Sequence, residues 1–116
     1  MSHRPGHEPA AFTTPERDLI RREFCRHFGE DPSAADGILL RTWRSGPQKG
    51  QPKLLAAAQS MLERGPIEIR TVRMGPRAFF TETGQAALRQ LLLDRRAMDP
   101  GRFAHLRHEL AVQPID

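Results

Sequence analysis

The chain has 116 residues, of which 38% are hydrophobic and 28% charged, an ordinary composition for one soluble globular domain. No apolar run approaches the roughly 18 residues of a transmembrane helix, and the first residues lack the apolar segment of a secretory signal peptide. We therefore expect a cytoplasmic protein with no membrane partner. The single cysteine, Cys25, excludes an intramolecular disulfide framework, and we expect it to be a buried structural thiol.

The positive charge is concentrated in the middle third of the chain, although the net charge of the whole is only +4. Between Arg41 and Arg77 lie eight basic residues and two acidic ones, Glu63 and Glu68, so this stretch carries a net charge of +6. Segregated positive charge can attract nucleic acid, an anionic membrane or an acidic protein. The structural alternative is a solvated helix face.

The N-terminal part is predicted to be a disordered tail over residues 1–13, followed by two helices. The first helix begins at Thr14-Pro15-Glu16, where a hydroxyl cap precedes proline and an acid, and it ends at Gly29. The second begins near Asp31-Pro32 and ends at residues 45–47. The expected apolar faces consist of Leu19, Ile20, Phe24 and Phe28 in the first helix and of Ala35, Ile38, Leu39 and Trp43 in the second.

The centre of the chain is predicted to be a loop, a third helix and a β-hairpin. Residues 45–52 contain two glycines and two prolines, which is typical of a loop. The third helix takes Pro52 as its first residue and ends at Arg64, because the following glycine and proline stop it. Alternation of apolar and polar residues over 67–72 predicts one strand, and residues 78–80 predict the return strand after a turn at 74–76.

Two further helices are expected after the hairpin. Thr83 is expected to cap a fourth helix that reaches Leu93, and Asp99-Pro100 begins a short fifth one. Because a two-stranded hairpin alone is barely stable in water, it must pack on the neighbouring helices. The predicted fold is therefore mainly α with a two-stranded β-hairpin, a winged-helix (α+β) single domain over residues 14–116.

Two segments carry a resemblance to a known family: "LLAAAQSMLERGPIEIR" from Leu54 and "RAFFTETGQAALRQLL" from Arg77. They resemble the helix, wing and following helix of winged helix-turn-helix regulators of the MarR and PadR kind, over about a third of the chain. A helix-turn-helix has a turn of about three to four residues before its recognition helix, whereas residues 45–52 are a longer loop. Either a short helix lies in "PQKGQP" or the second helix of the motif is absent.

The resemblance implies that the third helix enters the major groove of double-stranded DNA and that wing arginines hold phosphates. The DNA-binding residues expected on this basis are Lys49, Lys53, Gln59, Ser60, Arg64, Arg70, Arg73 and Arg77, with Arg41 and Arg44 at flanking phosphates. Alternatively, the alanines of this helix pack on another helix and its polar groups face water. The resemblance also implies a homodimer through the C-terminal helices, formed by Leu91, Leu92, Leu93, Phe103, Leu106 and Leu110; core burial is the competing role for most of these side chains.

No catalytic, metal or cofactor site is expected. The five histidines form neither a His-Glu-x-x-His motif nor a zinc-finger spacing, and no glycine-rich phosphate loop follows a strand. We therefore expect a non-enzymatic DNA-binding protein, a transcriptional regulator. The alternatives are an interaction module whose basic face meets an acidic partner, and a structural subunit. DNA binding predicts that Arg73 and Arg77 share one surface with the third helix. An interaction module predicts that the outer face of this helix is covered, or that an exposed apolar patch adjoins the charges.

Overall fold

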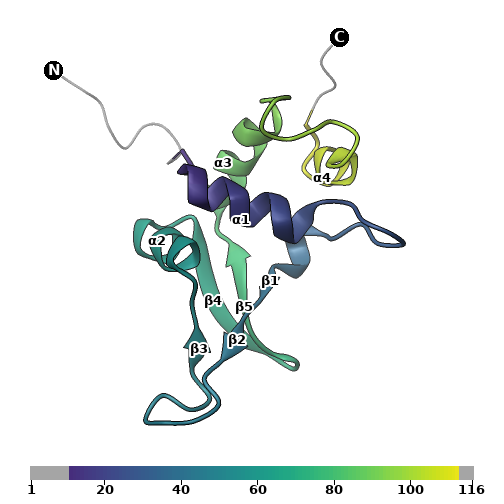
Figure 1. Cartoon of the computed structure of the whole chain (residues 1–116). Coiled ribbons are helices and arrows are strands. Elements are labelled where there is room, and N and C mark those ends of the chain that lie inside the picture. The colour runs from purple at the N-terminus through teal and green to yellow at the C-terminus, as the bar shows by residue number, and fades with distance from the viewer. Residues whose placement is uncertain (1–10, 113–116) are drawn as a thin grey trace, which may run out of the picture.

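The computed structural model describes residues 11–112 as a small α+β domain (Figure 1). β1, β5 and β4 form a three-stranded antiparallel sheet in that order, and β2 and β3 form a separate antiparallel ribbon. The expected hairpin is present, but a third strand extends it. The elements are α1 (Thr14–Phe24), the 3₁₀ helix η1 (Ala34–Asp36), β1 (Ile38–Leu39), β2 (Arg41–Thr42), β3 (Pro52–Lys53), α2 (Ala56–Arg64), β4 (Ile67–Val72), β5 (Gly75–Phe80), α3 (Glu82–Leu92) and α4 (Ala104–Glu109).

A capping box starts α1, one residue earlier than expected. The Thr13 hydroxyl accepts a hydrogen bond from the Glu16 amide at 3.3 Å, and the Glu16 carboxylate accepts one from the Thr13 amide at 2.9 Å. Phe12 is buried, and its ring meets that of Phe80 edge-on with centroids 6.4 Å apart. Phe12 and Thr13 thus belong to the folded domain, whereas residues 1–10 of the predicted tail lie outside the described residues.

α1 ends at Phe24, well before the predicted stop at Gly29. The Arg26 amide donates to the Arg102 carbonyl at 2.9 Å, which turns the chain away from the helix axis. As a result Phe28 is fully exposed and does not extend the apolar face of α1. Cys25 is only half-buried, and its thiol donates to the Arg26 carbonyl, so the expectation of a buried thiol is corrected.

The predicted second helix is wrong, because residues 34–42 form η1, β1 and β2 instead. Gly37 ends η1 with φ +71°, and a Cβ at this position would lie 2.4 Å from the Ala78 carbonyl oxygen. Ile38 then pairs with Ala78 along the edge of β5 that β4 leaves open. Strand pairing with a segment distant in sequence outweighs the helical spacing of the apolar residues.

The region between β1 and α2 contains no helix, so the second helix of a helix-turn-helix is absent. Arg41 pairs with Lys53 and Thr42 pairs with Pro52, which makes residues 41–53 a two-stranded ribbon. Pro52 therefore begins a strand and not the predicted helix. α2 begins at Ala56, later than predicted, and ends at Arg64, as predicted. The following residue, Gly65, adopts φ +109°, and its amide donates to the Met61 carbonyl.

The β4–β5 hairpin is confirmed, but its turn lies at residues 73–74 and not at the predicted 74–76, so β5 begins at Gly75. Ile67 pairs with Phe80, and all three of Ile67, Phe80 and Ala78 are buried on the face that belongs to the core. Because side chains alternate along a strand, Arg70 and Arg77, which also pair, lie on the opposite face. The hairpin thus has one apolar face and one arginine-bearing face.

α3 begins at Glu82, with Thr81 as its cap in place of the predicted Thr83. The Thr81 hydroxyl donates to the Gly65 carbonyl at 2.6 Å, and its amide donates to the Pro66 carbonyl at 3.0 Å. Gly84 is buried against the same segment, since a Cβ there would come 1.9 Å from the Pro66 carbonyl oxygen. The absence of a side chain at Gly84 therefore allows α3 to approach the start of β4.

The hydrophobic core contains residues from α1, α2, the sheet, α3 and the C-terminal segment. Of the six apolar residues proposed for a dimer interface, only Leu93 is exposed, at 43%. Core burial of most of them is confirmed, and dimerisation stays a prediction. The five that are buried are Leu91, Leu92, Phe103, Leu106 and Leu110.

Candidate nucleic-acid interface

The β2–β3 ribbon and the hairpin turn extend to the same end of the molecule, away from α1, α3 and α4 (Figure 1). The Leu40 amide donates to the Pro76 carbonyl at 3.1 Å, which fixes the start of the ribbon against the base of β5. Further along, the Trp43 amide donates to the Gln51 carbonyl at 3.0 Å, and the Gly50 amide donates to the Trp43 carbonyl at 2.9 Å. Backbone bonds therefore hold the ribbon in one arrangement up to Trp43.

A groove of about 930 Å³ separates the ribbon from the hairpin turn. One wall is the ribbon, from Thr42 to Ser45 together with Lys53, and the other is the hairpin at Met74, Gly75 and Pro76. Leu39 and Leu40 connect the two walls. The groove is open to solvent and accessible to a large ligand.

The groove is cationic. Arg41, Arg44 and Lys53 line it, and none of its lining residues is acidic. The surrounding sequence explains this, since residues 37–62 and 69–81 contain no Asp or Glu. Exposed Arg73 adds a further cation at the hairpin turn, and exposed Lys49 adds one in the ribbon loop. Such a surface attracts polyanions.

Large apolar side chains are exposed beside these cations. Trp43 is 38% exposed, Leu39 56% and Met74 77%, and all three line the groove. The Lys53 ammonium lies 4.9 Å from the centre of the Trp43 ring, within the range of a cation–π contact. The sequence places Trp43 on an apolar helix face and therefore does not predict it as a residue of this site. The available signal was its position in a long stretch without acidic residues.

The predicted binding residues divide into three groups. Lys49, Lys53 and Arg73 lie on the ribbon or the hairpin turn, so Lys53 is not on the third helix where the resemblance implied it. Arg70 and Arg77 are on the other face of the hairpin and do not project with α2. The Arg70 guanidinium lies 4.0 Å from the Phe79 ring centre and 3.4 Å from the Glu68 carboxylate, while the Arg77 Nε donates to the Asp36 carbonyl at 2.6 Å.

The third group, Gln59, Ser60 and Arg64, lies on α2, where two of the three residues contact Glu16. Ser60 donates a hydrogen bond of 2.6 Å to the Glu16 carboxylate, and Arg64 forms an ion pair with the same group. Gln59 is exposed, but its amide donates to Glu63 at 2.9 Å. Arg64, the only basic residue of α2, is therefore engaged with Glu16, and the exposed positions Ala56, Gln59 and Glu63 carry no positive charge.

Glu16 is the only buried charged side chain in residues 11–112, and it is fully shielded from solvent. Burial raises the pKa of this carboxyl, but the hydrogen bonds from Arg64, Ser60 and the Thr13 amide outweigh burial and hold the pKa below its ordinary value. Glu16 thus joins the start of α1 to the exposed end of α2 as a carboxylate.

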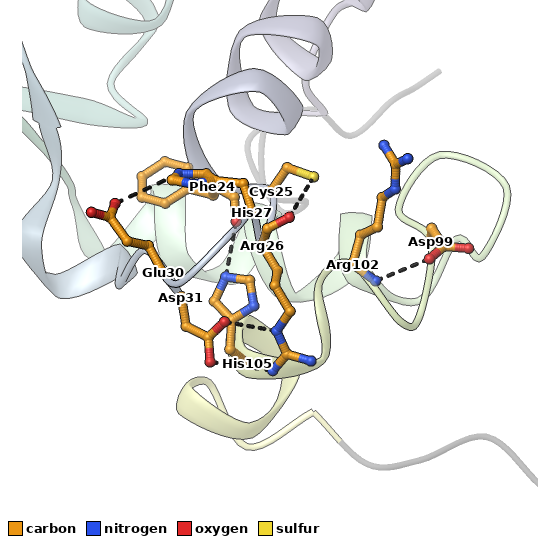
Figure 2. A network of polar contacts seen from close by, with 9 residues as sticks. All are labelled: Phe24, Cys25, Arg26, His27, Glu30, Asp31, Asp99, Arg102 and His105. Atoms are coloured by element: carbon orange, nitrogen blue, oxygen red, sulfur yellow. Dashed lines mark hydrogen bonds and ion pairs between the residues drawn. The ribbon is translucent and has the colours of Figure 1, made fainter.

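A second polar cluster stabilises the turn after α1 (Figure 2). The Arg26 guanidinium binds the Asp31 carboxylate at 2.7 Å and holds the pKa of that carboxyl below its ordinary value. The backbones of His27 and Glu30 exchange two hydrogen bonds, and His105 Nε2 lies 2.9 Å from the Phe24 carbonyl oxygen. Within residues 11–112 no three His, Cys, Asp or Glu side chains are grouped to hold a metal ion.

No protein-family model, curated protein sequence or solved structure matches the chain. In the described part of the chain, no helix has the length and apolar character needed to cross a bilayer. The geometry of residues 11–112 is therefore the basis for any functional assignment.

Proposed function

We propose that the protein is a small winged-helix DNA-binding protein, acting as a transcriptional regulator, whose β2–β3 ribbon and hairpin turn contact a DNA duplex. The observation that carries this proposal is the acid-free groove with Arg41, Arg44 and Lys53. Cations spaced along such a surface neutralise backbone phosphates and release counterions, which is the main source of sequence-independent affinity for DNA.

The order of the strands supports the winged-helix assignment. A helix and a short strand precede α2, and that strand adds to β5, so the β4–β5 hairpin has the place of a wing. The β2–β3 ribbon stands where the resemblance implies the second helix. Because a two-stranded ribbon fits the major groove as a helix does, the ribbon and the wing replace α2 as the proposed DNA contact.

A second candidate is an acidic protein partner, and one observation favours it. Leu39, Trp43 and Met74 are exposed beside the cations, as expected for an interaction module and not required for phosphate contact. Exposed apolar side chains grouped within a polar rim are common at protein-binding sites.

The test is fluorescence anisotropy with a labelled random-sequence duplex, titrated at low and at physiological salt. We expect micromolar binding that weakens steeply with salt, and the Arg44→Ala/Arg73→Ala variant should reduce the slope of log K against log salt by about 2, since each lost phosphate contact contributes about 0.9. Arg95→Ala/Arg96→Ala removes the same charge from exposed positions outside the groove and is the matched control. Equal losses in the two variants would exclude the groove as the contact site. Absence of binding at low salt would leave the acidic protein partner as the remaining candidate.

A further inference from the structure

Trp43 is presented as a fixed aromatic surface at the wall of the groove. Its backbone amide and carbonyl are both hydrogen-bonded within the ribbon, to Gln51 and Gly50. Its side chain is 38% exposed, although burying a large indole normally stabilises a small domain. The ribbon thus fixes the backbone of an aromatic side chain that the core does not use.

One cation lies over this indole, and two others line the same groove. Lys53 lies over the ring at 4.9 Å, and Arg44 is the next residue in the chain. Arg41 lies opposite Lys53 in the ribbon register. Met74 and Pro76 line the facing wall of the groove. An aromatic face beside positive charges is the arrangement that binds one nucleotide, because the base stacks on the ring while the cations hold its phosphate.

Contact with a fully paired duplex does not account for this arrangement. Phosphates on the outside of a duplex need only the cations, and its bases are already stacked on one another. An unpaired base, in contrast, has a free aromatic face that can stack on Trp43. A ligand with at least one unpaired nucleotide would therefore use the exposed indole, which a fully paired duplex leaves without a role.

We propose that the groove binds an unpaired nucleotide of DNA, with the base stacked on Trp43 and the phosphate held by Lys53 and Arg44. The inference rests on the proposed function, since it assigns the ligand of the same surface. The preferred ligand is then a duplex with a single-stranded extension, in which Trp43 stacks on an unpaired base while the ribbon and the hairpin turn contact the adjoining duplex. Stacking tolerates any base, so no strong sequence preference is expected at this position.

The intrinsic fluorescence of the protein provides a direct test. Trp43 is the only tryptophan and the chain has no tyrosine, so its emission reports on this groove alone. We expect an oligothymidine, and a duplex with an oligothymidine extension, to quench this emission, whereas a blunt duplex of the same length leaves it nearly unchanged. Anisotropy of the same labelled DNAs gives the affinities independently of the tryptophan.

The variants separate stacking from charge. Trp43→Ala should weaken binding of the extended duplex about tenfold, equivalent to about 1.4 kcal/mol, and leave blunt-duplex binding unchanged. Trp43→Phe should recover most of the loss because it restores an aromatic face. Phe28→Ala removes a fully exposed aromatic residue outside the groove and should have no effect.

The outcomes distinguish this inference from the proposed function. If the wild type binds blunt and extended duplexes equally, without quenching, and Trp43→Ala binds as the wild type does, base stacking is excluded while DNA binding stands. If neither DNA binds at low salt, both are overturned. If Trp43→Ala does not give the circular dichroism spectrum of the folded wild type, it is left out of the comparison. Binding by Trp43→Phe and the quenching of the wild-type fluorescence then decide the result.

Discussion

Glu16 shows how a single buried carboxylate connects segments that are distant in sequence. Its two oxygens accept from the Thr13 amide, Ser60 and Arg64, so one side chain completes the α1 cap and ties α2 to α1. From the sequence, Glu16 could be assigned only to the first turn of a helix, and Ser60 and Arg64 were expected to be DNA-binding residues. No local pattern marks a contact between residues so far apart in the chain.

Replacing Glu16 with glutamine should destabilise the protein in a pH-dependent way. Because the folded-state pKa is below the ordinary value of 4.5, the carboxylate adds stability above that value, and this contribution is lost as pH falls through the folded-state pKa. We expect Glu16→Gln to cost about 2 kcal/mol at neutral pH, as for hydrogen bonds to a charged group, and the difference from wild type to shrink in acid. Urea denaturation across this pH range measures it. Glu82→Gln, at an exposed first-turn position, is the control, and a constant difference at all pH values would contradict the assignment.

Between elements, the approach of α3 to the hairpin depends on the absence of a side chain. The Gly84 Cα faces the Pro66 carbonyl, and the amide of the cap residue Thr81 donates to the same carbonyl. The start of β4 and the start of α3 are thereby joined. This contact gives a structural reason for the "FTETG" segment, independent of any family resemblance.

Gly84→Ala should therefore separate α3 from the hairpin. A methyl group there would lie 1.9 Å from a backbone oxygen that cannot rotate away, and we expect a loss of about 3 kcal/mol, the upper range for overpacking. Thermal unfolding followed by circular dichroism gives the magnitude. Gly101→Ala is the matched control, because the new methyl would meet only the Asp99 side chain at 3.3 Å, and its cost should stay below about 1 kcal/mol. Equal melting temperatures for the two variants would refute the close contact.

The elements that sequence reasoning predicted are those specified locally. The start of α1 follows from Thr, Pro and Glu within a few residues, the end of α2 from Gly65, and the hairpin from its alternation. The prediction of a second helix was wrong because Ile38 pairs with β5, which lies much later in the chain. The same incorrect helix placed Trp43 on an apolar helix face. The cations of the candidate site were therefore predicted, and its aromatic surface was not.

In the molecule as a whole, the buried residues of the helical part and the proposed contact surface lie at different ends. Buried residues such as Leu92, Met98 and Leu106 belong to the helical part, whereas the ribbon and the hairpin turn extend from the opposite end (Figure 1). The segregation of positive charge was evident in the sequence. Its position away from the C-terminal core could be learned only from the structure.

This separation predicts that stability and DNA affinity can be changed independently. Leu106 is fully buried in α4, and Leu106→Ala should cost about 2–5 kcal/mol by leaving a cavity, yet bind DNA as the wild type does at temperatures where it stays folded. Arg44→Ala/Arg73→Ala should weaken DNA binding and leave the melting temperature within a few degrees, since both side chains are exposed. Denaturation and anisotropy on the same preparations measure both quantities. A loss of affinity in folded Leu106→Ala would mean that the C-terminal helix takes part in binding, and a markedly lower melting temperature for the arginine variant would mean that the ribbon and hairpin turn support the core.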